Sequence, residues 1–223
     1  ISRFGIELGF GDKTVEEVCE KFNVNLDFFL EITNSFVDED YIPQKELDTF
    51  PLNLIVDYLQ KTHQDYLDEK IPELEEMILN MVKDSPDEEK KNKLVTNFFK
   101  QYKEELTTHI DREEDNIQPY ILQLEEAWKK NELTDQLYNK IKEYSIDDFA
   151  GEHDNVEEKL YDLKNIIIKY LPPCKDKSLC NKILMELFRL EKDLNAHAEL
   201  EDKVLIPKVS EIEKILITQY ENK

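Results

Sequence analysis

Glycine is scarce in this chain of 223 residues, and so are the features that mark several other classes of protein. Only four glycines occur, and three of them lie within the first eleven residues. The chain after Gly11 is therefore poorly suited to the tight turns of β structure. No apolar run approaches the roughly 18 residues that a membrane-spanning helix needs. Three cysteines without Cys-x-x-Cys spacing favour neither a disulfide framework nor a zinc ribbon, and they suggest a reducing cytoplasm.

Positive charge is also in short supply. Lys and Arg total 29 against 51 Asp and Glu, which gives a net charge of −22 at pH 7. Such a chain repels the phosphates of nucleic acids and anionic lipids, so neither a nucleic acid nor a membrane is an expected partner. The remaining sequence is rich in Glu, Lys, Leu and Ile, which favour amphipathic helices. An all-α fold is therefore predicted.

The first residues differ from the rest of the chain. A turn-rich opening is followed by Thr14-Val-Glu-Glu17, which has the form of a capping box and predicts a short helix to about Phe22. Asn25 can cap a second helix that runs to about Ile32. A polar stretch with prolines near both ends then predicts a linker over residues 41–51. The sequence thus predicts a small helical N-terminal module over residues 1–45, followed by a domain over residues 46–223.

Four long helices are predicted from Leu52 onward, because apolar residues recur at helical spacing. The first helix extends toward Met81, and a break at residues 84–86 precedes the second. The predicted bounds of the later segments are: 117 for the end of the second helix, 119–130 for a continuation kinked at Pro119, 133–144 for a connecting segment, 147–171 for the third helix and 178–205 for the fourth. Helices of about 25 residues span nearly 40 Å, which suits an up-down four-helix bundle.

One histidine falls on each predicted long helix, and the chain has no others. They are His63, His109, His153 and His197. His109 and His197 precede Glu113 and Glu201 by four residues, so each imidazole shares a helix face with a carboxylate. A proline follows each glutamate by six residues, and the second motif repeats the first 88 positions later. The bundle therefore reads as two copies of a helical hairpin, each with one lone histidine and one His-x-x-x-Glu.

This repeat predicts a metal centre. A lone His-x-x-x-Glu is a frequent accident in so acidic a chain, whereas the recurrence of His, Glu and Pro in one register is not. Two imidazoles and one carboxylate per half predict two ions bridged by Glu113 and Glu201, with an oxide or hydroxide completing the bridge. Each ion keeps an open position, which suits iron that binds a small diatomic molecule. Manganese and zinc are alternatives, as is a metal-free bundle in which the histidines only pack.

The order of the motif distinguishes this site from others. Ferritin-like carboxylate sites use Glu-x-x-His. No acid stands three residues before any of the histidines, and His-Glu-x-x-His is also absent, so a ferritin-like oxidase and a zinc protease are disfavoured. Three acids adjoin predicted ligands and are candidates to accept the free N–H of a ligating imidazole. They are Glu114, Glu152 and Asp154.

At these residues the chain resembles the hemerythrin-like (HHE cation-binding) domains, and more closely the di-iron "repair of iron centres" proteins associated with nitrosative and oxidative stress. The segments that carry the resemblance are residues 57–63, 105–119, 152–154 and 195–207. The resemblance implies that the four histidines and two glutamates bind two iron ions and that Glu113 and Glu201 bridge them. Oxygen-carrying hemerythrins have a fifth histidine, which this chain lacks.

The N-terminal residues resemble the small N-terminal domain of the same family, through residues 4–6 and 15–18. Members commonly carry adjacent cysteines in the opening turn, but here the turn reads Leu8-Gly9-Phe10-Gly11. This departure argues against a thiol-dependent role in iron or sulfur handling. Cys19 is instead predicted to be a buried apolar residue of its short helix.

Two functions remain open at this point. The first is a stress-response di-iron protein that binds nitric oxide or oxygen, or that supplies iron to damaged iron-sulfur proteins. The second is a sensing or iron-storage module without catalytic turnover, which the missing cysteines favour. The sequence does not decide whether the chain is an enzyme, and a homodimer is compatible with it.

Overall fold

The computed structural model describes residues 1–37, 41, 47–83, 89–151, 156–170 and 175–222. All regular structure in these residues is helical, so the predicted all-α fold is confirmed. The elements in order are η1 (Ser2–Phe4), α1 (Val15–Lys21), α2 (Leu26–Val37), α4 (Leu52–Gln64), η2 (Asp65–Lys70), α5 (Ile71–Lys83), α6 (Glu89–Arg112), η4 (Glu113–Ile117), α7 (Gln118–Lys130), α8 (Asp135–Glu143), α9 (Ile146–Gly151), α10 (Val156–Tyr170), α11 (Lys177–Leu200), η5 (Glu201–Leu205) and α12 (Ile206–Glu221). Within the described ranges, no helix is both long and apolar enough to cross a membrane.

The chain divides into two compact units. The first unit comprises Ile1–Thr62, Asn116–His153 and Ala196–Lys223, and the second comprises His63–Asp115 and Asp154–Asn195. Each unit has its own apolar core. The predicted boundary between residues 45 and 46 falls outside the described residues, and that division stays a prediction.

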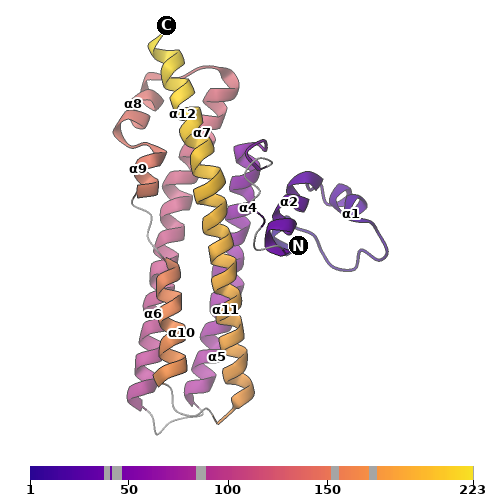
Figure 1. Cartoon of the computed structure of the whole chain (residues 1–223), viewed down its shortest axis with the longest axis vertical. Helices are drawn as coiled ribbons and strands as arrows, with labels where there is room; N and C mark the ends of the chain where they lie inside the picture. The colour runs from indigo at the N-terminus through magenta and orange to yellow at the C-terminus, as the bar shows by residue number, and fades with distance from the viewer. Residues whose placement is uncertain (38–40, 42–46, 84–88, 152–155, 171–174, 223) are drawn as a thin grey trace. The chain divides into compact units, whose positions relative to one another are not determined.

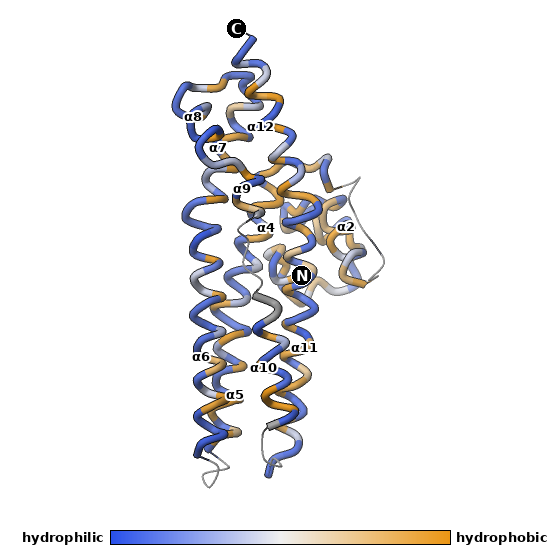
Figure 2. The backbone as a smooth tube through the Cα atoms, turned by 60° about the vertical axis from the view of Figure 1, so that its left-hand side comes forward, coloured by the Kyte–Doolittle hydropathy of each residue, from blue (hydrophilic) through white to orange (hydrophobic). Residues whose placement is uncertain are grey.

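The second unit is a four-helix bundle. Helices α5, α6, α10 and α11 run alongside one another, and each contributes to a single core (Figure 1). Its core includes Leu74 and Ile78 of α5, Phe99 and Leu106 of α6, Leu160 and Leu163 of α10, and Leu187 and Leu194 of α11. Hydrophobic positions recur along each helix between hydrophilic ones (Figure 2). This is the pattern expected of helices that bury one stripe and expose the rest.

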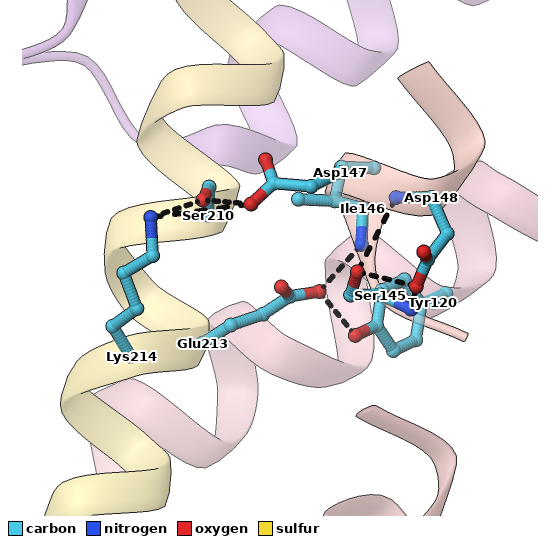
Figure 3. Close-up of polar contacts among 8 residues, drawn as sticks. All are labelled: Tyr120, Ser145, Ile146, Asp147, Asp148, Ser210, Glu213 and Lys214. Carbon is cyan, nitrogen blue, oxygen red and sulfur yellow. Dashed lines mark hydrogen bonds and ion pairs between the residues drawn. The ribbon is translucent and has the colours of Figure 1, made fainter. Parts of the chain in front are cut away.

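In the first unit, α4, α7, α8, α9 and α12 share a core, to which Phe28 of α2 also contributes. Glu213 of α12 fastens α9 to this core (Figure 3). Its carboxylate accepts a hydrogen bond from the hydroxyl of Tyr120 in α7 and another, at 2.9 Å, from the N–H of Ile146, the first residue of α9. Burial raises the pKa of Glu213, although both hydrogen bonds oppose that shift. Ser210 adds a second link, donating to Asp147 at 3.0 Å.

The start of α4 is held by two charged side chains of the first unit. Glu125 of α7, which is buried, accepts hydrogen bonds from the N–H groups of Leu52 at 2.8 Å and Asn53 at 3.2 Å. Lys208 of α12 donates to the carbonyl oxygens of Asp48 and Phe50. The first turn of a helix has N–H groups without partners inside the helix, so Glu125 satisfies two of them and places negative charge at the positive end of the helix dipole.

The N-terminal helices follow the sequence closely. Thr14 and Glu17 form the predicted capping box. The N–H of Glu17 donates to Oγ1 of Thr14 at 3.2 Å, and the N–H of Thr14 donates to Oε2 of Glu17 at 2.8 Å. Asn25 accepts from the N–H of Phe28 at 2.9 Å, as predicted, although α2 continues to Val37 rather than ending near residue 32. Cys19 is buried in a small core with Ile6, Val18 and Phe29, which confirms its apolar role.

Two expectations from the sequence are wrong. The predicted connecting segment over residues 133–144 contains helix α8, whose first N–H groups are capped by Thr134 through a 3.3 Å hydrogen bond from the N–H of Leu137. Cys180 is disulfide-bonded, so the cysteines are not all reduced thiols. The predicted break at residues 84–86 and the prolines at 172 and 173 lie outside the described residues.

Candidate metal centre

Three of the predicted ligand-bearing helices change from α to π geometry beside the predicted ligands. Segment η2 begins two residues after His63, η4 begins at Glu113, and η5 begins at Glu201. A π segment closes its hydrogen bonds over five residues instead of four, and such segments are frequent at functional sites. The polypeptide therefore departs from regular α geometry at each of these three positions.

Proline explains where these segments lie. Pro72, Pro119 and Pro207 are each the second residue of the α-helix that follows a π segment. Proline has no N–H, and its ring crowds the carbonyl group four residues earlier, so the α-helical ladder cannot run through it. The wider π turn lets the helix continue through this interruption. The predicted kink at Pro119 is thus a π segment that leads directly into α7.

Four of the predicted ligands converge. His63, Glu113, His197 and Glu201 each offer one ligand atom, and these four atoms lie within 4.8 Å of one another. All four residues are buried. Two carboxylates are costly to bury unless a cation or several donors balance them, so this group has the composition and setting of a metal site.

Glu113 faces two histidines, one with each carboxylate oxygen. Its Oε2 lies 3.3 Å from Nε2 of His63, and its Oε1 lies 3.2 Å from Nε2 of His109. Donor atoms bound to one ion at about 2.1 Å and separated by 90–110° lie roughly 3.0–3.4 Å apart. The observed spacings match that range, so each of these two pairs is spaced as donors to one cation would be. Glu113 thus has one histidine beside each of its carboxylate oxygens.

The second His-x-x-x-Glu has the same local geometry. Nε2 of His197 lies 3.3 Å from Oε1 of Glu201, four residues later, just as His109 lies beside Glu113. The two motifs, which are 88 residues apart in the sequence, therefore place an imidazole and a carboxylate together in the same way.

Glu114 is one of the three acids predicted to accept the N–H of a ligating imidazole, and it lies beside the predicted ligand His63. Its Oε1 lies 3.0 Å from Nδ1 of His63. When Nδ1–H donates to Glu114, the imidazole presents the lone pair of Nε2 toward Glu113. A carboxylate in this position orients the ring and strengthens it as a metal ligand.

The remaining candidates are not brought into this group by the described part of the chain. His153, Glu152 and Asp154 lie outside the described residues. The sequence pattern did not predict the π segments or the role of Pro72, which occupies the same place after η2 as the other two prolines after η4 and η5. The only available signal was the recurrence of proline shortly after a ligand.

A family model described as Hemerythrin HHE cation binding domain matches residues 54–209. The chain belongs to this family. The matched span contains both His-x-x-x-Glu motifs and both lone histidines, and it includes helices from both units. A search among curated proteins gives no match. Membership in the hemerythrin HHE family therefore supports a helical bundle that binds a cation, in agreement with the buried His and Glu group.

Proposed function

We propose that this hemerythrin-domain chain is a non-haem di-iron protein. His63, His109, His153 and His197 would hold the two ions, and Glu113 and Glu201 would bridge them. The observation that carries the proposal is the buried group of His63, Glu113, His197 and Glu201, whose ligand atoms lie within 4.8 Å of one another. When bound, an iron pair with an open position supplies reversible binding of a small diatomic molecule.

The chain's own residues have distinct tasks in this proposal. The two glutamates neutralise much of the charge of the cations, and their four-residue spacing from a histidine fixes the orientation of both donors. Glu114 holds the proton on Nδ1 of His63, which keeps Nε2 available as a ligand. Buried apolar residues on the same helices, such as Leu106, Ile110 and Leu194, limit access of bulk water.

The physiological role that we infer is nitrosative or oxidative stress response. In that role the iron pair binds nitric oxide or oxygen, or supplies iron for the repair of damaged iron-sulfur clusters. The alternative is a sensing or iron-storage module without turnover. It is favoured by the opening turn, which reads Leu8-Gly9-Phe10-Gly11 and provides no adjacent thiols for iron or sulfur transfer.

The first test is the metal content of the full chain purified without chelators. About two irons per chain, with visible bands of an oxo-bridged ferric pair that bleach on reduction, are the expected result. The double variant His109→Ala, His197→Ala should lose nearly all bound iron. Thr108→Ala with Glu199→Ala is the matched control, because both residues are exposed neighbours on the same helices. Full iron content in the histidine double variant would refute the ligand assignment.

The two roles are then separated by what happens to the iron. A repair protein should transfer iron to an apo iron-sulfur protein and regenerate its cluster, whereas a sensing or storage module should retain the iron under the same conditions. Consumption of nitric oxide or peroxide over many turnovers would count against the module without turnover.

A further inference from the structure

Gln118 is a buried polar residue whose amide is unpaired within the described part of the chain. It is the first residue of α7 and is 2% exposed. Among the residues that the structure describes, neither Oε1 nor Nε2 of Gln118 has a hydrogen-bond partner. A buried amide without hydrogen bonds is destabilising, so its retention calls for a partner other than the described protein groups.

The pairing of α4 with α7 places Gln118 along the helix from the metal group. Glu125 contacts Leu52 near the start of α4, and Glu113 contacts His63 near its end. His63 is eleven residues after Leu52, and Glu113 is twelve residues before Glu125. The two segments therefore run antiparallel, and nearly one residue of one segment pairs with each residue of the other. Seven residues back from Glu125 is Gln118, which therefore lies level with Leu59. His63 is four residues further along α4, about 6 Å at 1.5 Å per residue.

The direction of Gln118 follows from the same helix. Residues seven apart on an α-helix share a face, so Gln118 lies on the face of α7 that carries Glu125, the face that contacts α4. On the other side of Gln118, segment η4 closes its hydrogen bonds over five residues, so Gln118 follows Glu113 by one π turn. Gln118 is thus one turn from both members of the His63–Glu113 pair.

The internal repeat shows that this amide has no counterpart. The two His-x-x-x-Glu motifs are offset by 88 residues, and the same offset from Gln118 leads to Ile206, which is buried and apolar. Each is the residue directly before a proline and directly after a π segment. The two halves of the centre therefore differ at this position, with a hydrogen-bonding group on one side and a hydrocarbon on the other.

We propose that Gln118 is a ligand-binding residue whose amide hydrogen-bonds the non-protein ligand of the metal centre on the Glu113 side. Nε2 donates to an acceptor atom of a small anionic or partly negative ligand, and Oε1 accepts from its proton when it has one. Because the position equivalent to Gln118 in the second half is the apolar Ile206, only the Glu113 side of the centre offers an amide at this position. Such a ligand is therefore held on the Glu113 side. This inference rests on the proposed di-iron function.

The test compares Gln118→Leu with Gln123→Leu in the full, iron-loaded chain. Gln123 is an exposed glutamine of the same helix, so the control repeats the chemical change away from the core. Azide is the probe, and its affinity is measured by titration of the visible absorption. Gln118→Leu should bind azide about tenfold more weakly at unchanged iron content, the loss of one hydrogen bond. Gln123→Leu should bind azide like the wild type.

A second readout does not need the metal. Removing an amide that is unpaired among the described residues should leave the thermal midpoint of the apo chain equal to or above that of the wild type, whereas loss of a structural hydrogen bond would lower it. Gln118→Met provides the same comparison if leucine packs poorly. Unchanged azide affinity in iron-loaded Gln118→Leu would overturn this inference but not the proposed di-iron function. A lowered apo midpoint in both Gln118→Leu and Gln118→Met would do the same. A wild-type chain that binds no iron refutes the proposed function and this inference with it.

Discussion

Substitution of Glu125 by alanine should destabilise the chain far more than the same change at its neighbour Glu126. Both glutamates lie on α7 and both face a lysine four residues later, Lys129 and Lys130. Glu125, however, is buried and accepts two hydrogen bonds from the first N–H groups of α4. Glu126 is exposed and its ion pair lies in solvent.

The magnitude follows from those contacts. A hydrogen bond to a charged group contributes about 1.5–3 kcal/mol, and part of the gain at Glu125 is offset by burial of the carboxylate. The net loss for Glu125→Ala should be about 2–4 kcal/mol. For a chain of this size, each kcal/mol lowers the melting temperature by about 2–4 °C, so a fall of roughly 5–15 °C is expected.

Thermal unfolding of the apo chain followed by far-UV circular dichroism measures this effect. Glu126→Ala is the control and should leave the midpoint nearly unchanged, because an exposed ion pair contributes little. Equal midpoints for the two variants would show that Glu125 does not hold the start of α4. The pairing of α4 with α7 would then rest only on the contact between Glu113 and His63.

Two further predictions concern other carboxylates. Glu114→Ala should weaken metal binding about tenfold, because Glu114 orients His63, while Asp115→Ala should not. Competition with a chelator measures the affinities, and equal values would exclude an orienting role for Glu114. Burial raises the pKa of Glu213 above its ordinary value of 4.5. At a pH between the ordinary pKa and the raised native-state pKa, the native state keeps a proton on Glu213 that the unfolded state has released. The free energy of unfolding therefore falls as the pH rises through this interval. Glu213→Gln should therefore lose less stability than the wild type as the pH rises above 4.5 in urea unfolding, and parallel curves would contradict this assignment.

The sequence predicted those parts of the fold that depend on local chemistry. The capping box at Thr14, the cap at Asn25 and the helical spacing of apolar residues are readable without tertiary information, and each corresponds to an observed element. Helix α8 was missed because only Leu137 and Ile141 of its residues are buried, which is too few to give a clear periodicity. Thr134 at its start was the available signal.

The candidate site was predictable to the extent that it repeats. His109 and His197 share a register with a following glutamate, and that recurrence predicted Glu113, His197 and Glu201, which are three of the four residues that converge. The contact between His63 and Glu114 depends on the pairing of two helices, which no spacing within one helix reveals. The burial of Glu125 and Glu213 was equally hidden, because an acid on a helix is ordinarily exposed.

The π segments could not be predicted, because the apolar pattern does not change at them. Along α6 and η4, the buried residues Leu106, Ile110, Glu113 and Ile117 keep spacings of four, three and four, as in an uninterrupted α-helix. A π turn nevertheless adds one residue, which rotates the following helix by about 100° relative to a regular continuation. Buried residues that follow one continuous spacing in the sequence therefore face a different direction after Pro119 than before it. Proline at the second position of the next helix fixes where that change occurs, and Glu113, a predicted ligand, is the first residue of the π segment.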